Sequence, residues 1–385
     1  MNNFEFYNPT KIVFGPDKVA ELANLVPPAA RVLILFGGAS AQKTGTLDEV
    51  KAALGSRSVH EFGGIEPNPT YETLMKAVEQ VKREKIDFLL AVGGGSVIDG
   101  TKFVAAAACF DGEPWDILLK GGSLVKQALP FGTVLTLPAT GSEMNSGSVV
   151  TRKSTHTKLS FMSRHVFPQF SVLDPTKTYT LPPKQIANGI ADAFVHTVEQ
   201  YLTYPVQALP QDRFAEGLLQ TLIEIAPKAL AEPEDYDTRA NLMWTATLAL
   251  NGLIGAGVPQ DWATHMIGHE LTALYGIDHA RTLAIVLPSL LKVKRETKRA
   301  KLLQYAERVW HITSGTDDER IDAAIARTRA FFESLGIQTQ LSGYALGQEA
   351  VDAVVAQLET HGMTALGEHK DISLEVSRAI LQAAL

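Results

Sequence analysis

The sequence predicts an α/β domain over residues 1–181, with a parallel sheet covered by helices on both faces, followed by an all-helical domain over residues 182–385. In the first part, short apolar runs alternate with helical stretches, as in buried parallel strands joined by crossover helices. In the second part, apolar residues recur almost only at the i, i+3, i+4 spacing of amphipathic helices. A chain of 385 residues also favours two domains over one.

Each expected strand of the first part ends in glycine, serine or threonine. The strands are expected at Arg31–Phe36, Asp87–Val92, Phe131–Pro138 and Phe170–Pro175, and a helix is expected over residues 68–85. The first three are followed by "GGAS", "GGGS" and "ATGSE". Parallel sheets bind ligands at the carboxyl ends of their strands, so this edge is the expected binding edge.

The second part carries helical spacing over five long segments. They span residues 182–202, 212–230, 237–253, 298–310 and 318–336. Pro182 and Pro183 stand where prolines start helices, and Gly276 and Gly336 stand where glycines end them.

Composition excludes several classes of function. A net charge of −7 without a concentrated basic surface argues against nucleic-acid binding. No apolar run reaches the ~18–20 residues that span a bilayer. Cys109 lies in an apolar helical run and is expected to be a core residue. The N-terminal residues do not have the pattern of a signal peptide, so a cytoplasmic protein is expected.

The motif "AVGGGSVIDGTK" joins a buried strand to a helix through three glycines. Gly94, Gly95 and Ser96 would let the backbone approach a phosphate at the positive end of a helix. Neither the G-x-G-x-x-G fingerprint nor a Walker A sequence is present. The alternative is a tight strand-to-helix turn that binds no ligand.

The segment "LILFGGASAQK" predicts the preferred nucleotide. NAD-binding domains place an acid after a strand to bind the ribose hydroxyls, and this segment has none. It offers Gly37, Gly38 and Ser40, with Lys43 further on. Backbone N–H groups, a hydroxyl and an ammonium suit a 2′-phosphate, so NADP(H) is predicted over NAD(H).

Histidines are concentrated in "DWATHMIGHELTALYGIDHA", which holds His265, His269 and His279. His265 and His269 are four residues apart and share a helix face, as do Asp192 and His196 in "ADAFVHT". Nitrogen and oxygen ligands of this kind suit Fe²⁺ or Zn²⁺. The alternative is a set of unrelated core and surface imidazoles, and spacing alone does not distinguish His265 from His269.

These motifs together resemble the metal-dependent, or iron-containing, alcohol dehydrogenase family. The resemblance rests on "GGGSVIDGTK", "LTLPATGSE", "DPTKTYTLP", "DAFVHTVEQY" and "DWATHMIGHELTALYGIDHARTLAIVLP", spread over the whole chain. It is strongest for the branch of bacterial NADPH-dependent aldehyde reductases and butanol dehydrogenases. It implies a Rossmann-like N-terminal domain and a helical C-terminal domain, the dehydroquinate synthase-like fold.

The resemblance also implies roles for individual residues. It assigns the metal ligands to Asp192, His196, His265 and His279, and makes His269 the catalytic residue that faces nicotinamide and substrate. Ala280 departs from the glycine that many members have after the last ligand. The cofactor contacts it implies, beside Gly37, Gly38 and Ser40, are Asn68, Tyr71, Gly94, Gly95, Ser96, Asp99, Thr136, Asn145, Lys158 and Thr180.

The activity implied is reversible hydride transfer between NADP(H) and short to medium aldehydes in a cytoplasmic homodimer. The N-terminal "FYNPTKIVFG" resembles a strand that could pair across subunits. Apolar residues around the histidines, among them Trp262, Met266 and Tyr275, favour small neutral aldehydes over phosphorylated substrates. The rivals are a dehydroquinate synthase-like lyase, a polyol-phosphate dehydrogenase, a metallohydrolase and a non-catalytic binding module.

Overall fold

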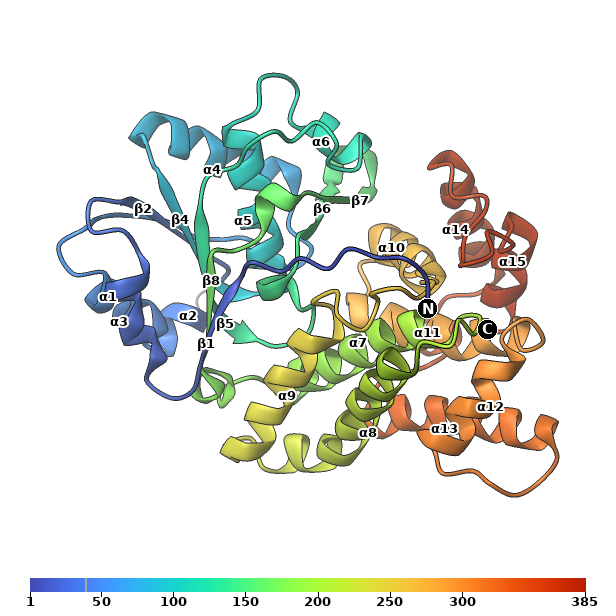
Figure 1. Ribbon diagram of the computed structural model, residues 1–385. Coiled ribbons are helices and arrows are strands. Elements are labelled where there is room, and N and C mark those ends of the chain that lie inside the picture. The colour runs from blue at the N-terminus through green and yellow to red at the C-terminus, as the bar shows by residue number, and fades with distance from the viewer. Residues whose placement is uncertain (39) are drawn as a thin grey trace. The chain divides into compact units, whose positions relative to one another are not determined.

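The computed structural model describes residues 1–38 and 40–385, which form two compact units. The sheet unit comprises Tyr7–Pro182 and Glu232–Thr247. The helical unit comprises Met1–Phe6, Pro183–Ala231 and Leu248–Leu385. Figure 1 shows the strands of the sheet unit in blue and green and the helical unit mainly in yellow to red.

The sheet unit is built on six parallel strands in the order β1-β8-β5-β4-β2-β3. Their bounds are β1 Lys11–Phe14, β2 Arg31–Phe36, β3 Ser58–Phe62, β4 Phe88–Gly94, β5 Phe131–Leu137 and β8 Phe170–Leu173. The four strands expected from the sequence are therefore confirmed as parts of one parallel sheet. β1, suggested as a strand for pairing across subunits, pairs here with β8 of its own chain.

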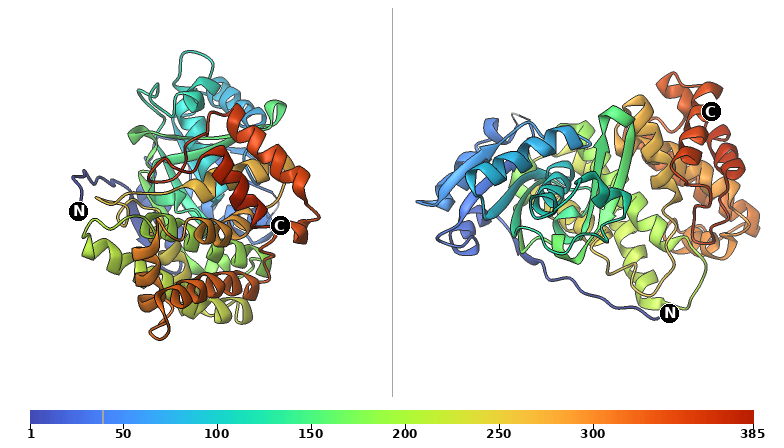
Figure 2. Two further views of the ribbon diagram at one scale, coloured as in Figure 1. Left: turned by 90° about the vertical axis from the view of Figure 1, so that its right-hand side faces the viewer. Right: turned by 90° about the horizontal axis from the view of Figure 1, so that it is seen from above.

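Successive residues of the central strands point to opposite faces of the sheet, and each face has its own core. Leu33 and Leu35 of β2 pack with helices α4 (Tyr71–Glu84) and α5 (Gly95–Ala108). Val32 and Ile34 pack with helices α1 (Leu22–Leu25) and α3 (Thr46–Leu54) on the other face. The blue and cyan helices on the two sides of the sheet are visible in Figure 2. Burial on both faces explains why β2 reads as an unbroken apolar run.

The other elements of the sheet unit are short helices and an antiparallel hairpin. The hairpin pairs β6 Gly147–Arg152 with β7 Thr157–Met162. The α-helices are α1 Leu22–Leu25, α2 Ser40–Lys43, α3 Thr46–Leu54, α4 Tyr71–Glu84, α5 Gly95–Ala108, α6 Trp115–Leu119 and most of α9 Tyr236–Ala249. The 3₁₀ turns are Lys18–Glu21, Ser142–Met144, Lys153–Thr155, Arg164–Val166 and Pro175–Thr178.

Helix α9 clusters with the sheet although its sequence follows residue 181. Met243 of α9 is fully buried in the core formed by α4, α5 and one face of the sheet. The ring of Trp244 meets Phe14 of β1 edge-on, with centroids 6.3 Å apart. Its helical spacing gave no sign of this packing, because periodicity shows which face is buried and not against what.

The helical unit has no strand among its described residues. Its helices are α7 Pro183–Tyr201, α8 Leu209–Ala231, α10 Ala263–Tyr275, α11 His279–Val293, α12 Arg299–Arg308, α13 Asp317–Ser334, α14 Gln348–Thr360 and α15 Leu374–Gln382, with a 3₁₀ turn at Leu341–Tyr344. Pro183 begins α7 as expected. Gly276 ends α10 with φ 67°, and Gly336 follows α13 with φ 74°, both in the left-handed region.

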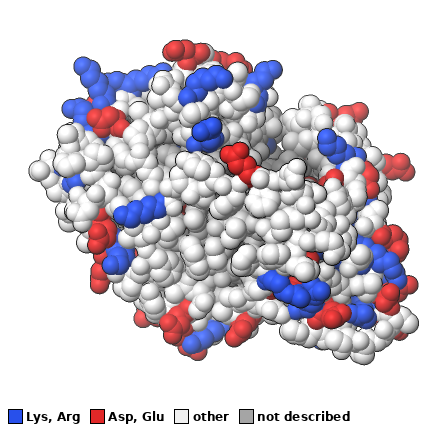
Figure 3. Space-filling view, viewed as in Figure 1, with Lys and Arg blue, Asp and Glu red and all other residues white. Residues whose placement is uncertain are grey.

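Two features of the surface and the helices bear on the excluded functions. Nowhere in the described chain is a helix both long and apolar enough for a membrane span. On the face drawn in Figure 3, Lys and Arg side chains are interspersed with Asp and Glu and do not form a continuous basic stripe.

Gly132 of β5 offers a test of how tightly the sheet core is packed. A Cβ at this position would lie 2.2 Å from Cζ of Phe170, whose ring stacks on Phe88. Gly132→Ala should therefore lower the stability of the sheet unit by about 1–3 kcal/mol through overpacking. The measurement is the urea concentration at the midpoint of unfolding, which should fall. The control is Gly217→Ala in α8, where a Cβ meets nothing within 4 Å, and which should not destabilise the protein.

Candidate functional site

Three helices of the helical unit bring four candidate metal ligands together. Asp192 and His196 lie one turn apart on α7, His265 lies on α10, and His279 is the first residue of α11. The left-handed turn at Gly276 ends α10 and lets the chain enter α11 within three residues. Helix periodicity and one glycine thus produce the cluster.

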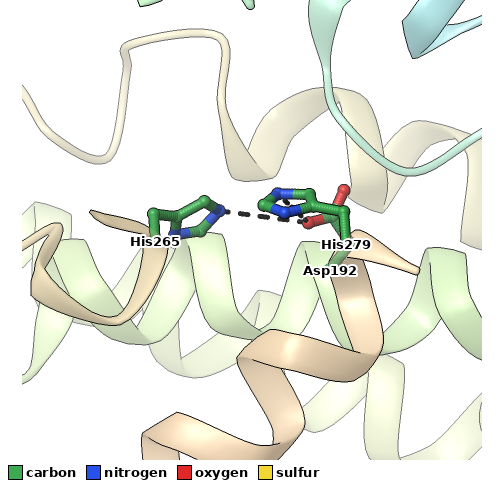
Figure 4. A group of neighbouring side chains, drawn as sticks. All are labelled: Asp192, His265 and His279. Carbon is green, nitrogen blue, oxygen red and sulfur yellow. Dashed lines mark ion pairs between the residues drawn. The ribbon is translucent and has the colours of Figure 1, made fainter. Parts of the chain in front are cut away.

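The carboxylate of Asp192 is the centre of this cluster. Its Oδ1 lies 3.7 Å from Nε2 of His196, 4.0 Å from Nε2 of His265 and 3.7 Å from Nε2 of His279. In Figure 4 the nitrogens of His265 and His279 face this carboxylate. Asp192, His265 and His279 have ligand atoms all within 4.8 Å of one another, the arrangement of a candidate metal site.

The spacing of these atoms fits a metal ion better than a hydrogen-bond network. Oδ1 of Asp192 is buried and has no hydrogen-bond partner among the described residues. Distances of 3.7–4.0 Å are too long for hydrogen bonds. They are slightly longer than the ~3.4 Å between two ligands of a tetrahedral ion with bonds of ~2.1 Å. A buried carboxylate oxygen that lacks a hydrogen bond needs another source of stabilisation, which a cation would supply.

Burial shows from which side the cluster is accessible. The side chains of Asp192, His196 and His265 are 4%, 5% and 7% exposed, whereas that of His279 is 22% exposed. A substrate would therefore approach beside His279.

Glu199 is a functional candidate that the sequence analysis missed. Its Oε2 makes a short hydrogen bond with Nδ1 of His265, and its Oε1 accepts from the backbone N–H of Thr264 at 2.7 Å. A carboxylate on Nδ1 orients a metal-binding imidazole and keeps Nε2 available as the ligand atom. Glu199 lies seven residues after Asp192 and therefore on the same face of α7. This spacing was the only sign in the sequence that Glu199 could belong to the site.

His269 is buried close to the cluster and lies outside the set of nearest ligand atoms. Its ring centroid is 5.2 Å from that of His279 and 6.2 Å from that of His265. His269 is only 4% exposed. This position suits a group that acts on a bound substrate.

In the sheet unit, the three glycines at the junction of β4 and α5 allow close packing at the start of the helix. A Cβ on Gly94 would lie 2.9 Å from Cβ of Leu137, and one on Gly95 would lie 2.3 Å from Oγ1 of Thr140. The loop after β5 can therefore approach the helix N-terminus only because these residues lack side chains.

Three of the predicted cofactor contacts form a chain of hydrogen bonds beside this helix N-terminus. The N–H of Asn68 donates to Oγ of Ser96 at 3.3 Å, and Nζ of Lys158 donates to Oδ1 of Asn68 at 2.9 Å. Lys158 is only 5% exposed, so it is a buried ammonium and not a solvated surface lysine. A buried cation next to a helix N-terminus favours an anion such as a phosphate.

Asp99 and Lys102 of α5 hold the loop after β5 in place. Nζ of the fully buried Lys102 donates to Ser142, Asn145 and the carbonyl of Gly147 at 2.8–2.9 Å. Desolvation lowers the pKa of Lys102 to about 8, although Asp99 and Glu143 oppose this shift. The sequence analysis missed Lys102, which follows Asp99 by one helical turn in "IDGTK".

The remaining predicted cofactor residues are more dispersed. Gly37 and Gly38 follow β2, and Gly38 is exposed with open space around it. Thr136 is half-buried in β5. The Tyr71 hydroxyl donates to Glu113. The amide of Asn145 is held by Lys102, the N–H of Gly147 and the carbonyl of Gly141.

Two of the predicted cofactor residues, Ser40 and Thr180, do not support their assignment. Ser40 begins α2, but its side chain lies outside the described part of the structure. Thr180, one of the cofactor contacts that the resemblance implies, was taken to lie at a strand end, and this was wrong: β8 ends at Leu173, a 3₁₀ turn at Pro175–Thr178 follows, and Thr180 is exposed beyond it.

Comparison with known families matches almost the entire chain. The family described as iron-containing alcohol dehydrogenase matches residues 9–175, and the C-terminal part of the Fe-containing alcohol dehydrogenase family matches residues 186–385. The NADPH-dependent aldehyde reductase YqhD of Escherichia coli K12 is 65% identical over 100% of both chains. A protein described as probable NADH-dependent butanol dehydrogenase 1 of Bacillus subtilis is 43% identical, also over 100% of both.

Solved structures give the same relationship. A crystal structure of E. coli K-12 YqhD has a TM-score of 0.99 and 64% identity, covering 100% of this chain and 99% of that one. The NADH-dependent butanol dehydrogenase A of Thermotoga maritima has a TM-score of 0.94 and 35% identity, with the same coverage.

The ligand set can be tested by metal content. Asp192→Ala should lose the metal, because it removes the oxygen that three imidazoles surround. His269→Ala should keep it, because its ring lies outside that group. Elemental analysis of the purified variants decides between them. Retention of metal in His279→Ala together with its loss in His269→Ala would contradict the assignment.

Glu199→Gln should weaken metal binding about ten- to hundredfold, because it removes the charge that polarises the Nδ1–H of His265. Competition with a chromophoric chelator measures the change. Glu216→Gln is the matched control, since this buried acid of α8 binds Tyr201 and Arg308 and contacts none of the candidate ligands. Equal affinities of both variants and the unmodified protein would exclude an orienting role for Glu199.

Proposed function

The chain belongs to the iron-containing alcohol dehydrogenase family, and on this premise we propose that it reduces short to medium aldehydes to primary alcohols with NADPH. The reaction would use one divalent metal ion, Fe²⁺ or Zn²⁺. The observation that carries the proposal is the buried Asp192 carboxylate, which three imidazole nitrogens surround without hydrogen-bonding to it. The full-length identity of 65% to a protein named NADPH-dependent aldehyde reductase supports the choice of substrate and cofactor.

In this proposal Asp192, His196, His265 and His279 hold the metal ion. When bound, the ion supplies Lewis-acid polarisation of a carbonyl oxygen. Glu199 keeps the His265 ring in one orientation, and the packing of α7, α10 and α11 holds the four side chains in place without substrate. The three least exposed ligands exclude water from one side, and substrate enters beside the more exposed His279.

His269 is proposed to carry the proton. Reduction of an aldehyde requires a proton at the carbonyl oxygen, and imidazole gains and loses protons near neutral pH. The His269 ring lies next to that of His279, the most exposed of the four candidate ligands. It can therefore pass a proton between a bound substrate and solvent while other side chains hold the metal.

The sheet unit is proposed to bind the nucleotide. Gly94, Gly95 and Ser96 would accept the pyrophosphate at the start of α5, with Asn68 and Lys158 beside them. Asp99, through Ser142 and the N–H of Val149, would hold the surrounding loop in place. The further contacts proposed are Gly37, Gly38, Ser40, Tyr71, Thr136, Asn145 and Thr180.

The choice of NADPH over NADH rests on the residues after β2. Relatives of this chain carry names with either cofactor, so family membership alone leaves the choice open. Gly37 and Gly38 present no carboxylate that would repel a 2′-phosphate, and Gly38 has open space around it. The name of the 65% identical relative supports the same choice.

The proposal extends to organisation. The division near residue 181 would separate nucleotide binding from metal binding, and the protein would work as a cytoplasmic homodimer. Aldehydes and alcohols would be its small-molecule partners.

The proposed activity predicts that NADPH is oxidised in the presence of butanal and that a strong chelator abolishes the reaction, with recovery when Fe²⁺ or Zn²⁺ is returned. Absorbance of the reduced nicotinamide follows both steps. The ratio of kcat/KM for NADPH to that for NADH should be well above one. Activity that survives complete metal removal would refute the metal-assisted mechanism. A ratio of one would refute the preference for NADPH.

A further inference from the structure

Trp262, the residue that precedes α10, has a backbone conformation that tryptophan rarely adopts. Its φ of 62° and ψ of 3° lie in the left-handed region, at the N-cap of the helix that carries His265. A bulky residue in this region is strained, and it persists only where the surrounding contacts determine its conformation. Strained residues cluster at functional sites, so the Trp262 side chain is expected to have a role at the neighbouring candidate metal ligands.

The indole of Trp262 packs against two of the four candidate ligands. Its centroid lies 5.3 Å from that of the His265 ring and 6.2 Å from that of the His196 ring, separations at which aromatic rings are in contact. Within the described chain, Trp262 makes no ring contact with His279. The side chains of His265 and His196 are 7% and 5% exposed, whereas that of His279 is 22% exposed. The imidazoles that the indole meets are therefore the shielded ones.

Two hydrogen bonds fix the orientation of this half-buried indole. Nε1 of Trp262 donates to Oε1 of Gln260 at 2.8 Å, and Nε2 of Gln260 donates to the carbonyl of Gly255 at 3.3 Å. A Cβ on Gly255 would lie 2.4 Å from Nε2 of Gln260, so the amide can reach this carbonyl only because residue 255 is a glycine. The indole is therefore held beside the two imidazoles by contacts of its own.

The backbone on both sides of Trp262 is fixed as well. The N–H of Asp261 donates to the carbonyl of Glu199 at 2.9 Å, and the N–H of Ala263 donates to Oδ1 of Asp261 at 3.0 Å. The other oxygen of Asp261, Oδ2, pairs with the buried ammonium of Lys298 at 2.8 Å. Glu199 is also the residue that orients a ligand imidazole. One set of contacts thus holds both the strained tryptophan and the ligand beside it.

We propose that Trp262 covers one side of the metal centre and that its indole slows loss of the ion by keeping water and competing ligands away from His196 and His265. The inference rests on the proposed function, because it concerns the same metal site. The apolar groups around a metal site control the access of solvent to it. An indole held across two ligands would close that side, so that exchange of the ion is confined to the side of the more exposed His279.

The test is the rate at which Zn²⁺ leaves the loaded protein in the presence of an excess of a chromophoric chelator. Trp262→Asn removes the ring, and asparagine tolerates the left-handed conformation and is favoured at N-caps, so the backbone can keep its course. Release from this variant should be about tenfold faster than from the unmodified protein. Trp262→Phe keeps an aromatic ring at the same place and should restore most of the slow release.

The matched control is Trp244→Asn. Trp244 packs against Phe14, and within the described chain it makes no ring contact with a candidate ligand, so its loss should leave the release rate unchanged. Equal release rates for Trp262→Asn and the unmodified protein would overturn the inference. Release from Trp262→Phe as fast as from Trp262→Asn would also overturn it, because the ring would then not be the cover.

Fluorescence gives a second measurement that does not depend on turnover. Co²⁺ quenches the emission of an indole close to it, so loading with Co²⁺ should quench the unmodified protein and Trp244→Phe, and Trp262→Phe should lose most of this quenching. Full quenching in Trp262→Phe would show that the indole does not lie over the ion. Absence of any metal binding would refute the proposed function together with this inference, whereas normal binding with unchanged release would refute this inference alone.

Discussion

The buried carboxylate of Asp192, with three imidazole nitrogens within 4.0 Å, is the interaction on which the candidate active site depends. Burying an acid and three histidines is unfavourable unless these groups are hydrogen-bonded, paired or bound to a cation. The helices that carry them are otherwise packed with apolar residues, among them Phe194, Ile267 and Leu283. The same packing that stabilises the helical unit therefore forces the ligands together. Binding of a cation would in turn stabilise that packing, since a ligand of the folded state shifts the folding equilibrium.

Sequence spacing predicted the four-residue pairs of this site and could not distinguish their members. His265 and His269 share one face of α10, and only their contacts with residues of other helices distinguish them. Glu199 contacts Nδ1 of His265, and Nε2 of His265 faces Asp192. This contact is tertiary, so the sequence analysis needed the family resemblance to choose His265. The spacing from Asp192 also places the acid Glu199 on the same face of α7. Its role can be assigned only when the imidazole that it contacts is known.

The sheet was predictable where its strands are buried on both faces. β2 and β4 read as unbroken apolar runs because nearly every residue in them is buried. β1 and β3 have no buried position, and in the β6–β7 hairpin buried residues alternate with more exposed ones, so these sequences lack such a run. Edge strands and hairpins are stabilised by pairing with neighbours as much as by burial, and pairing leaves a weaker trace in composition. The placement of α9 with the sheet was missed for a different reason, because helical spacing shows which face is buried and not what covers it.

The glycine motif between β4 and α5 is weaker evidence for a binding site than its sequence alone suggests. Close packing alone accounts for Gly93, Gly94 and Gly95, because a Cβ at each would collide with Val97, Leu137 or Thr140. A ligand-free turn would need the same glycines. The burial of Lys158 is a better argument for an anion-binding site, because burying an ammonium group is unfavourable. The neighbours of Lys158 in the sequence are polar and would also have allowed a solvated position. Its hydrogen bond to Asn68, which in turn donates to Ser96, joins a strand, a loop and a helix N-terminus into one polar chain. Such a chain suits phosphate oxygens, and it also ties the β6–β7 hairpin to the loop before α4, where the N–H of Thr151 donates to the carbonyl of Pro69 at 2.9 Å.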